Sequence, residues 1–289
     1  MSISVEFKNV SFRYTGIEGS DQMVLNDISF TLDRPQCTAI IGHSGSGKTT
    51  LIQHFTGLLK PSKGNILVDG KDIWSSRYKF SELRKRIGIV FQFPETQLFE
   101  ETVEKDIAFG PKNLGFRGED LTRRVHNAMQ AVDLQPQKFC HRSPFKISEG
   151  EKRRAAIAGV LAMEPEMIVF DEPTAGLDPR GVRKIQKIVR KLLQAEKSVV
   201  LVTHNIDFMV EICDRALVLI NGAIAYDGDV KELFRRHADI VQKAGLEMPS
   251  LTGAIKTFEK ILPPDLLQVF TLEELTTRLN ALKKESIGS

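Results

Sequence analysis

The chain has 289 residues, of which 42% are hydrophobic, and its 40 basic and 37 acidic residues leave a formal net charge of +3. This length suffices for one large core, or for a large domain together with a small one. The basic residues are interspersed with acidic ones and form no block, so the charge pattern does not indicate a nucleic-acid partner. No apolar run approaches the roughly 18 residues that span a bilayer, so a role at a membrane would require other proteins to hold the chain there.

The three cysteines, Cys37, Cys140 and Cys213, are far apart and form no CxxC pair. Their number and spacing predict neither a disulfide framework nor a zinc site. Cys37 and Cys213 have apolar neighbours, so we expect both to be small core residues. The N-terminal segment lacks the basic start and apolar stretch of a signal peptide, and we expect a reducing compartment.

The first part of the chain has the pattern of strands. Residues 5–14 and 24–32 alternate apolar and polar side chains, which is typical of half-buried strands. The polar segment 15–22 is expected to be a loop between them. The apolar run 37–41 stops at a glycine-rich loop, and a helix is predicted over residues 48–58. Two further strands are predicted at 66–68 and 87–91.

From residue 93 to 147 the pattern becomes helical and rich in charge, which predicts a helical insertion into the sheet domain. Residues 167–170 form an apolar run, as expected for a parallel strand buried on both faces, and 198–203 predicts another buried strand. Apolar positions after Arg180 recur with helical spacing, and Asn221-Gly222 predicts a tight hairpin. Residues 245–250 are interpreted as a linker to two amphipathic helices, predicted at 251–261 and 272–282.

Residues 42–49 match the phosphate-binding pattern G-x-x-x-x-G-K-[ST], and they follow an apolar strand and open a helix, as that motif requires. Glycines let backbone N–H groups point at phosphate oxygens, and the helix N-terminus adds partial positive charge. Lys48 is expected to reach the β- and γ-phosphates, and Thr49 to bind Mg²⁺ through its hydroxyl. The alternative is a glycine-rich turn with an accidental lysine. The predicted ATP-binding loop comprises Gly42, His43, Ser44, Gly45, Ser46, Gly47, Lys48, Thr49 and Thr50.

Polar side chains end three of the predicted strands. Asp171 and Glu172 follow one of them, where Asp171 is expected to hold Mg²⁺ and Glu172 to polarise an attacking water. His204 ends the strand VVLVT and would help to position that water near the γ-phosphate. Gln92 ends the strand before the helical insertion, so its amide is expected to reach the metal or the water. The alternatives are a solvated acidic pair and a structural histidine.

Together these motifs resemble the ATP-binding cassette (ABC) ATPases over about residues 3–240. The resemblance implies an α/β P-loop NTPase fold with a RecA-like, mostly parallel sheet core, an antiparallel β subdomain and a helical subdomain inserted at about 93–160. It implies that Tyr14 stacks on adenine, with an ordinary strand aromatic as the alternative, and that Asp178 belongs to the D-loop. It also implies a head-to-tail dimer, in which each ATP lies between one chain's P-loop and the other chain's signature loop.

A narrower resemblance lies in residues 91–115, FQFPETQLFEETVEKDIAFGPKNLG, and in the short C-terminal extension. These segments resemble the ATPases of energy-coupling factor (ECF) transporters, and most closely the A′ type. The resemblance implies ATP and Mg²⁺ as ligands, a heterodimer with a second ABC ATPase, and membrane partners called the T and S components. It implies a peripheral protein on the cytoplasmic face of the cell membrane that couples ATP hydrolysis to uptake of vitamins or other micronutrients. Residues 1–244 would form the ATPase domain, and the extension 245–289 would contact the partner ATPase.

The signature loop departs from the family pattern L-S-G-G-Q or L-S-G-G-E, because it comprises Ser148, Glu149, Gly150 and Glu151. A carboxylate near a helix N-terminus is favourable by roughly 0.3–1 kcal/mol. Close to the partner's γ-phosphate, however, the repulsion between unit charges reaches about 4 kcal/mol at about 4 Å and an effective dielectric constant near 20. One hypothesis is therefore functional asymmetry, with stronger hydrolysis at the site that contains this P-loop. The other is that Glu149 points to solvent and is tolerated.

Three other functions remain as alternatives to an ECF transporter subunit. The chain could be the ATPase of another importer, or an ABC ATPase that acts on DNA or ribosomes. The absence of sustained heptads disfavours a chromosome-acting type, and ribosome-acting types usually carry two cassettes. A regulatory subunit that binds ATP without hydrolysing it is disfavoured by Glu172 and His204, although Glu149 keeps it open.

Overall fold

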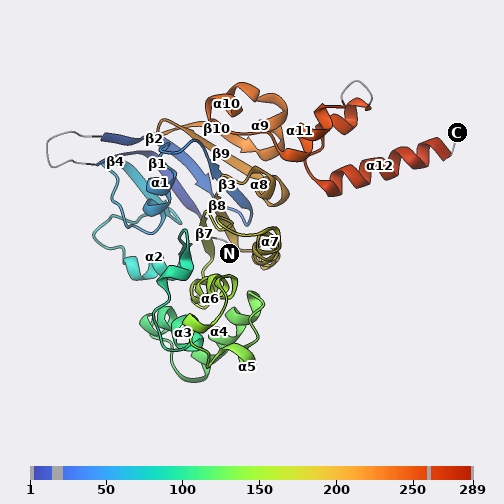
Figure 1. The fold of residues 1–289 in the computed structure, drawn as a ribbon. Helices are drawn as coiled ribbons and strands as arrows, with labels where there is room; N and C mark the ends of the chain where they lie inside the picture. The colour runs from blue at the N-terminus through green and yellow to red at the C-terminus, as the bar shows by residue number, and fades with distance from the viewer. Residues whose placement is uncertain (1–2, 15–21, 259–261, 288–289) are drawn as a thin grey trace.

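The structure is a computed structural model that describes residues 3–14, 22–258 and 262–287. The loop predicted at 15–22 lies outside the described residues except for Gln22, and so do the last three residues of the helix predicted at 251–261. Two β-sheets stand beside each other, a group of short helices lies below them, and a helical extension projects to one side (Figure 1). In the described part of the chain, no helix is long and apolar enough to cross a membrane.

The N-terminal half contributes a four-stranded antiparallel sheet. Buried and more exposed side chains alternate along parts of its first two strands, as the sequence predicts, and the alternation is broken where their pairing shifts register. Phe7 stacks on Phe30 across two of these strands, with ring centroids 4.6 Å apart, and both rings lie against Phe55. The order across the sheet is β2 (Gln22–Leu32), β1 (Val5–Tyr14), β4 (Lys63–Val68) and β5 (Lys71–Asp72).

The second sheet has six strands, and all of its neighbouring pairs are parallel except β10 with β9. Its inner strands are buried on both faces, which is why they are apolar in sequence. Asn221 and Gly222 join β9 to β10 with φ angles of 49° and 77°, so the predicted hairpin is confirmed. The strand order is β10 (Ala223–Asp229), β9 (Arg215–Ile220), β3 (Cys37–Ile41), β8 (Ser198–Val202), β7 (Met167–Asp171) and β6 (Ile87–Val90).

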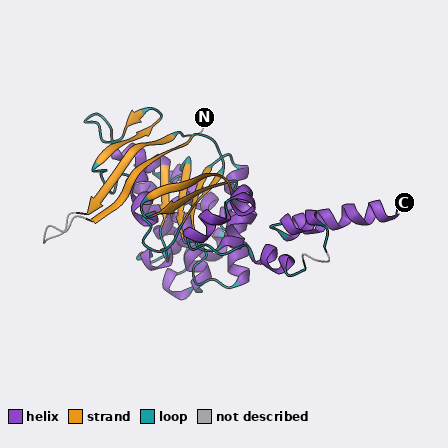
Figure 2. Cartoon of the chain, turned by 90° about the horizontal axis from the view of Figure 1, so that it is seen from above, coloured by secondary structure: helices purple, strands orange, loops and turns teal. Residues whose placement is uncertain are grey.

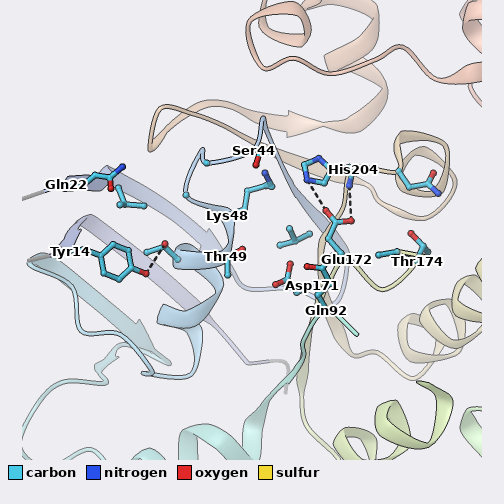
Figure 3. A pocket seen from close by; sticks show the side chains of 17 residues that line it. Tyr14, Gln22, Ser44, Lys48, Thr49, Gln92, Asp171, Glu172, Thr174 and His204 are labelled. Atoms are coloured by element: carbon cyan, nitrogen blue, oxygen red, sulfur yellow. Dashed lines mark hydrogen bonds and ion pairs between the residues drawn. The ribbon is translucent and has the colours of Figure 1, made fainter. Parts of the chain in front are cut away.

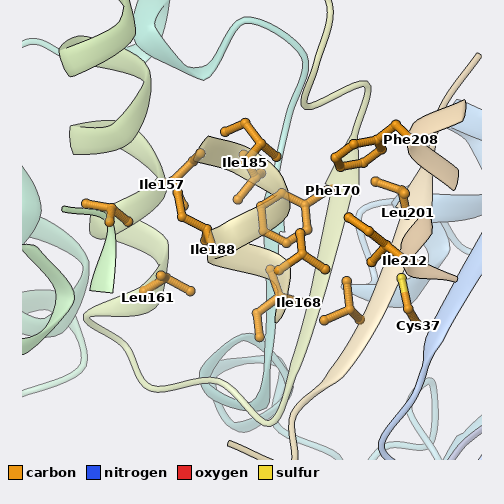
Figure 4. Packing of buried hydrophobic residues seen from close by; sticks show 14 of the residues in the cluster. Cys37, Ile157, Leu161, Ile168, Phe170, Ile185, Ile188, Leu201, Phe208 and Ile212 are labelled. Carbon is orange, nitrogen blue, oxygen red and sulfur yellow. The ribbon is translucent and has the colours of Figure 1, made fainter. Parts of the chain in front are cut away.

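Helices cover the six-stranded sheet. In Figure 4, Ile185 and Ile188 of α7 pack with Phe170 of β7, while Phe208 lies beside Leu201 of β8. The helix predicted at 48–58 ends earlier, because the chain turns at Thr56 and at a glycine with positive φ. In the described residues before the C-terminal extension, the helices outside the insertion are α1 (Lys48–Phe55), α2 (Phe80–Arg86), α7 (Pro179–Gln194), α8 (Ile206–Ile212), α9 (Val230–Arg236) and α10 (Ala238–Lys243).

A group of helices is inserted between β6 and β7, as the helical pattern predicts (Figure 1). Their apolar faces meet at buried side chains that include Ile107, Val125 and Ile157. Arg124 lies over the ring of Phe116, 3.8 Å from its centroid. The elements are η1 (Pro94–Gln97), α3 (Val103–Asn113), α4 (Gly118–Ala131), α5 (Pro136–Phe139), η2 (Pro144–Lys146) and α6 (Glu149–Leu161).

The C-terminal extension contains α11 (Ser250–Lys256), η3 (Pro264–Gln268) and α12 (Leu272–Ile287). The hydroxyl of Thr252 donates a hydrogen bond to the Val269 carbonyl at 2.8 Å, which ties α11 to the segment before α12. Both views show α12 projecting away from the two sheets (Figures 1 and 2). Along this helix Leu272 and Leu279 are exposed, so the extension carries apolar side chains that this chain does not cover.

Two of the cysteines are core residues, as expected. Cys37 and Cys213 are buried free thiols, with their sulfur atoms 3.0 Å apart. The third, Cys140, is buried in the helical insertion.

Candidate nucleotide-binding site

The glycine-rich loop leaves the end of β3 and leads into α1, in a conformation that depends on glycine. Gly42 has a φ of 150°, and a Cβ atom there would lie 2.2 Å from the Leu219 carbonyl oxygen. Gly47 has a φ of 104° and would bring a Cβ within 2.9 Å of the Val24 carbonyl oxygen. The loop therefore lies directly against neighbouring backbone and turns tightly into α1.

Lys48 is folded back onto this loop. Its ammonium group donates hydrogen bonds to the carbonyl oxygens of Gly42 and His43, both at 2.8 Å. Burial lowers the pKa of Lys48, while the nearby carboxylates of Glu172 and Asp171 act in the opposite direction. A buried cation therefore lies between the loop and two acids, at a position that suits phosphate oxygens.

A cavity of about 880 Å³ opens over the loop and brings most of the predicted site residues together (Figure 3). Gly42, His43 and Ser46 belong to the loop but do not line this cavity. The predicted residues that line it are Tyr14, Ser44, Gly45, Gly47, Lys48, Thr49, Thr50, Gln92, Asp171, Glu172 and His204. Gln22 and Asn205 also line it, although no motif in the sequence identified them.

The ends of two neighbouring strands, β7 and β8, place the acidic and imidazole groups on one side of the cavity. Glu172 has a φ of 47°, and its carboxylate accepts a hydrogen bond from the backbone N–H of His204 at 3.2 Å. The other carboxylate oxygen lies 3.2 Å from Nε2 of His204 (Figure 3). Burial raises the pKa of Glu172, partly offset by His204, and burial likewise raises the pKa of Asp171 against the attraction of Lys48. Glu172 is thus a partly buried carboxylate whose pKa is raised above its usual value.

Tyr14 and Gln92 lie at the rim of the cavity. The Tyr14 hydroxyl is 3.4 Å from the Thr50 hydroxyl, and its ring meets Phe12 edge-on. Tyr14 is 45% exposed, so one ring face remains available to a planar ligand. Gln92 is exposed at the end of β6, where the chain enters the helical insertion.

The predicted signature loop starts α6. Ser148 and Glu151 form a reciprocal capping box, in which the Glu151 carboxylate accepts from both the backbone N–H and the hydroxyl of Ser148 at 2.8 Å. Glu149 is exposed, and its carboxylate accepts a hydrogen bond from the Lys152 ammonium group at 2.6 Å. The negative charge of Glu149, which stands where the family pattern has glycine, is therefore paired with Lys152 of the same helix.

The signature loop does not reach the large cavity. Among the described residues, none of Ser148, Glu149, Gly150 and Glu151 lines it. Gly150 instead lines a second cavity of about 410 Å³, together with Asp178 at the start of α7. The side chain of Asp178 caps α7 by accepting from the Gly181 N–H at 2.6 Å.

Arg153 is a positioning residue that the sequence did not reveal. Its guanidinium forms a bidentate pair with Glu95, at 2.9 Å and 2.7 Å, and donates to the Ala175 carbonyl at 2.7 Å. It thereby joins the signature helix α6 to the segment after Gln92 and to the loop after Glu172. The partners lie far apart in sequence, so no local pattern indicates this junction.

The fold and the site define a P-loop ATPase of the ABC class, and the profile of the ABC transporter family matches residues 25–175. One relative is the "Energy-coupling factor transporter ATP-binding protein EcfA2" of Caldanaerobacter subterraneus subsp. tengcongensis, 45% identical over 95% of each chain. The protein of the same name from Clostridium perfringens is 43% identical over 88% of this chain and 89% of its own. The chain belongs to the ATP-binding proteins of energy-coupling factor transporters.

Solved structures agree with this assignment. The cbiO1 protein of Clostridium perfringens, described as part of the ABC transporter complex cbiONQ, has a TM-score of 0.74 and 36% identity over 89% of this chain and 100% of its own. A dimeric ATP-binding cassette with bound ADP and Pi has a TM-score of 0.67 and 28% identity over 78% of this chain and 98% of its own. The predicted fold, with its parallel core, antiparallel sheet and helical insertion, is confirmed.

Proposed function

We propose that the chain binds ATP in the large cavity and hydrolyses it as one subunit of an ECF-type importer. The observation that carries this proposal is the convergence of Lys48, Asp171, Glu172 and His204 on one cavity beside the glycine-rich loop. In this proposal the loop N–H groups and Lys48 hold the phosphates. Tyr14 packs against the adenine ring at the rim.

The donor set beside the phosphate loop fits Mg²⁺. A hydroxyl from Thr49, a carboxylate from Asp171 and an amide from Gln92 line the same cavity, and all can present oxygen atoms. Oxygen donors are the ligands that Mg²⁺ prefers, and it keeps part of its water shell beside substrate phosphates. When bound, the ion neutralises charge on the phosphate oxygens. We therefore propose Thr49, Asp171 and Gln92 as its protein ligands.

Glu172 and His204 supply the chemistry of hydrolysis in this proposal. Glu172 orients a water and accepts its proton as the water oxygen attacks the γ-phosphorus, and the bond to the β-phosphate oxygen breaks. The raised pKa of the Glu172 carboxyl suits this role, because a general base works best when its pKa is close to the working pH. His204 holds the carboxylate in place and stabilises charge on the transferred phosphoryl group.

A second ATPase completes each ATP site in this proposal. The chain's own signature loop is remote from its own cavity, whereas Gly150 and Asp178 line a separate hollow. We propose that this second surface faces the nucleotide held by a partner cassette, with Ser148 as a hydrogen-bond donor to its γ-phosphate. The exposed Leu272 and Leu279 of α12 support a dimer contact through the extension 245–289, attached to an ATPase domain of residues 1–244.

Glu149 makes the two composite sites unequal in this proposal. Its carboxylate pairs with Lys152 when the chain is alone, which reduces the repulsion that a facing γ-phosphate would experience. Turnover of the assembled heterodimer at saturating ATP tests the idea. Glu149→Gly should raise turnover and Lys152→Ala should lower it, and the double variant should match Glu149→Gly. Unchanged turnover in both single variants would mean that Glu149 is tolerated.

We further propose that closure of the ATPase pair drives uptake of a vitamin or another micronutrient through a membrane T component and a substrate-binding S component. The name of the ECF relatives and the cbiONQ complex of the cbiO1 protein support this assignment. The chain would then be a peripheral protein on the cytoplasmic face of the membrane, with no nucleic-acid partner.

Affinity purification from detergent-solubilised membranes of the source cells tests the partnership. The tagged full chain should bring down a second ABC ATPase in equal amount, together with an integral membrane protein. Alanine substitution of both Leu272 and Leu279 should reduce recovery of the second ATPase, whereas substitution of the exposed Leu58, which follows α1, should not. Recovery of homodimers without any membrane protein would contradict the proposal.

A further inference from the structure

Three metal-binding side chains converge in the helical insertion, away from the nucleotide cavity. Glu104 lies in the first turn of α3, His126 lies in α4, and Cys140 follows the last residue of α5. The His126 Nε2 atom is 3.6 Å from the Cys140 sulfur and 3.9 Å from Oε1 of Glu104. One donor atom from each of the three residues lies within 4.8 Å of the other two.

The backbone fixes this arrangement. The N–H of Glu104 donates to the Cys140 carbonyl at 3.1 Å, and the N–H of Val103 donates to the Arg142 carbonyl at 2.9 Å. The start of α3 is therefore anchored to the chain that leaves α5. On the buried side of the cluster, the Cys140 sulfur lies 3.7 Å from the Met129 sulfur.

The cluster is closed on one side and open on the other. Cys140 is only 5% exposed, whereas the side chains of Glu104 and His126 are 33% and 40% exposed. The exposed His141 lies nearby, with its Nδ1 atom 3.9 Å from the second Glu104 oxygen. A cation could enter from solvent without unfolding the helices, and one coordination position would remain for water.

We propose that Glu104, His126 and Cys140 form a binding site for a zinc-type divalent cation. Thiolate, imidazole and carboxylate are the three ligand types that Zn²⁺ uses in proteins, and three of them leave a fourth tetrahedral position open. The thiolate gives this site a different metal preference from the oxygen-lined Mg²⁺ position, because Mg²⁺ and Ca²⁺ bind poorly to soft ligands such as thiolates. The bound cation would connect α3, α4 and α5 within the segment that follows Gln92.

This site differs from the expectation drawn from cysteine spacing. Zinc sites are recognised in a sequence by closely spaced pairs of ligands, whereas these three residues lie in α3, in α4 and just after α5. The alternative is that Glu104 pairs weakly with the half-buried His126 and the exposed His141, while Cys140 serves only in packing. The two explanations differ in whether a thiolate of this chain binds a metal.

Optical titration of the reduced, metal-free full chain with Co²⁺ distinguishes a metal site from a packing role of Cys140. In a tetrahedral thiolate site, Co²⁺ shows a thiolate charge-transfer band and strong visible bands. We expect both at one equivalent, and Zn²⁺ should remove both. Cys140→Ser should abolish the charge-transfer band, and His126→Asn and Glu104→Gln should weaken Co²⁺ binding by at least about 10-fold. Cys37→Ala is the matched control, since it removes a buried thiol elsewhere and should leave the titration unchanged.

A thermal melt gives a second readout that does not depend on folding of the cysteine variant. Zn²⁺ should raise the melting temperature of the wild-type chain, because a ligand that binds only the folded state stabilises it, and should have a clearly smaller effect on His126→Asn. The proposal is overturned if wild-type protein shows no thiolate band. It is equally overturned if Cys37→Ala removes the band or if His126→Asn binds Co²⁺ as tightly as wild type.

Discussion

Replacing Arg153 with methionine tests whether the signature helix is held in place by one buried ion pair. Arg153 is 4% exposed and the Glu95 side chain is 12% exposed, so methionine would leave a carboxylate largely buried without its partner. Burial alone would raise the pKa of Glu95, but the hydrogen bonds from Arg153, a backbone hydrogen bond and the charges of Arg153 and Lys152 together hold that pKa below the usual value. Removal of one partner from a buried pair costs about 3–5 kcal/mol.

This loss can be measured as a fall in unfolding free energy in urea, or as a drop in melting temperature on the order of 10 °C for a chain of this size. Arg84→Met is the matched control, because Arg84 is exposed and its loss should cost less than about 0.5 kcal/mol. The destabilisation of Arg153→Met should begin to shrink as the pH falls through the raised pKa that burial gives Glu95 in the folded variant. It should continue to shrink until Glu95 is also protonated in folded wild type, below the usual glutamate value of about 4.3.

A double-mutant cycle completes the test. Glu95→Leu combined with Arg153→Met removes both charges, so the double variant should be less destabilised than the sum of the two single variants. If the single costs simply add, the pair does not carry the stability assigned to it. In that case the hydrogen bond from Arg153 to the Ala175 carbonyl would have to account for the loss.

Three further changes have defined outcomes. Gly42→Ala should weaken binding of a fluorescent ATP analogue and destabilise the chain by more than about 1 kcal/mol, because its Cβ would clash with backbone. Gly253→Ala is the control, because its Cβ meets open space and should change neither ATP binding nor stability. ATP turnover should fall on acidification with a midpoint above the usual glutamate pKa of about 4.3, because burial raises the pKa of Glu172. His204→Gln should move this midpoint to higher pH, because His204 lowers the pKa of Glu172. A midpoint at lower pH in the variant would contradict this. Arg86→Met removes ion pairs that connect the two sheets and should cost about 1 kcal/mol in urea unfolding.

The sheet core and the phosphate loop could be predicted from the sequence because each depends on residues that are close together in the chain. The short apolar run 167–170 is typical of a strand buried on both faces, and the spacing of Gly42, Gly47 and Lys48 indicates a loop that opens a helix. Strand ends then bring Asp171 and His204 to the same edge of the sheet. Ends of helices were predicted less well, as in α1, because capping depends on one or two residues.

The contacts that orient the motifs relative to one another could not be predicted in this way. Arg153 and Glu95 are separated by the whole helical insertion, and only the fold brings them together. The ion pair of Glu149 with Lys152 is different, since residues three apart on a helix are neighbours, and that spacing is visible in the sequence. The roles of Tyr14, Gln92 and the signature residues remain predictions.

The most direct test of the proposed function is phosphate release by the purified chain together with its second ATPase, compared between wild type and Glu172→Gln. We expect Mg²⁺-dependent turnover in wild type and a loss of at least about 100-fold in Glu172→Gln, with ATP binding retained, because the amide cannot accept a proton from water. Turnover in Glu172→Gln equal to wild type would mean that the site built around Glu172 and His204 does not carry out hydrolysis.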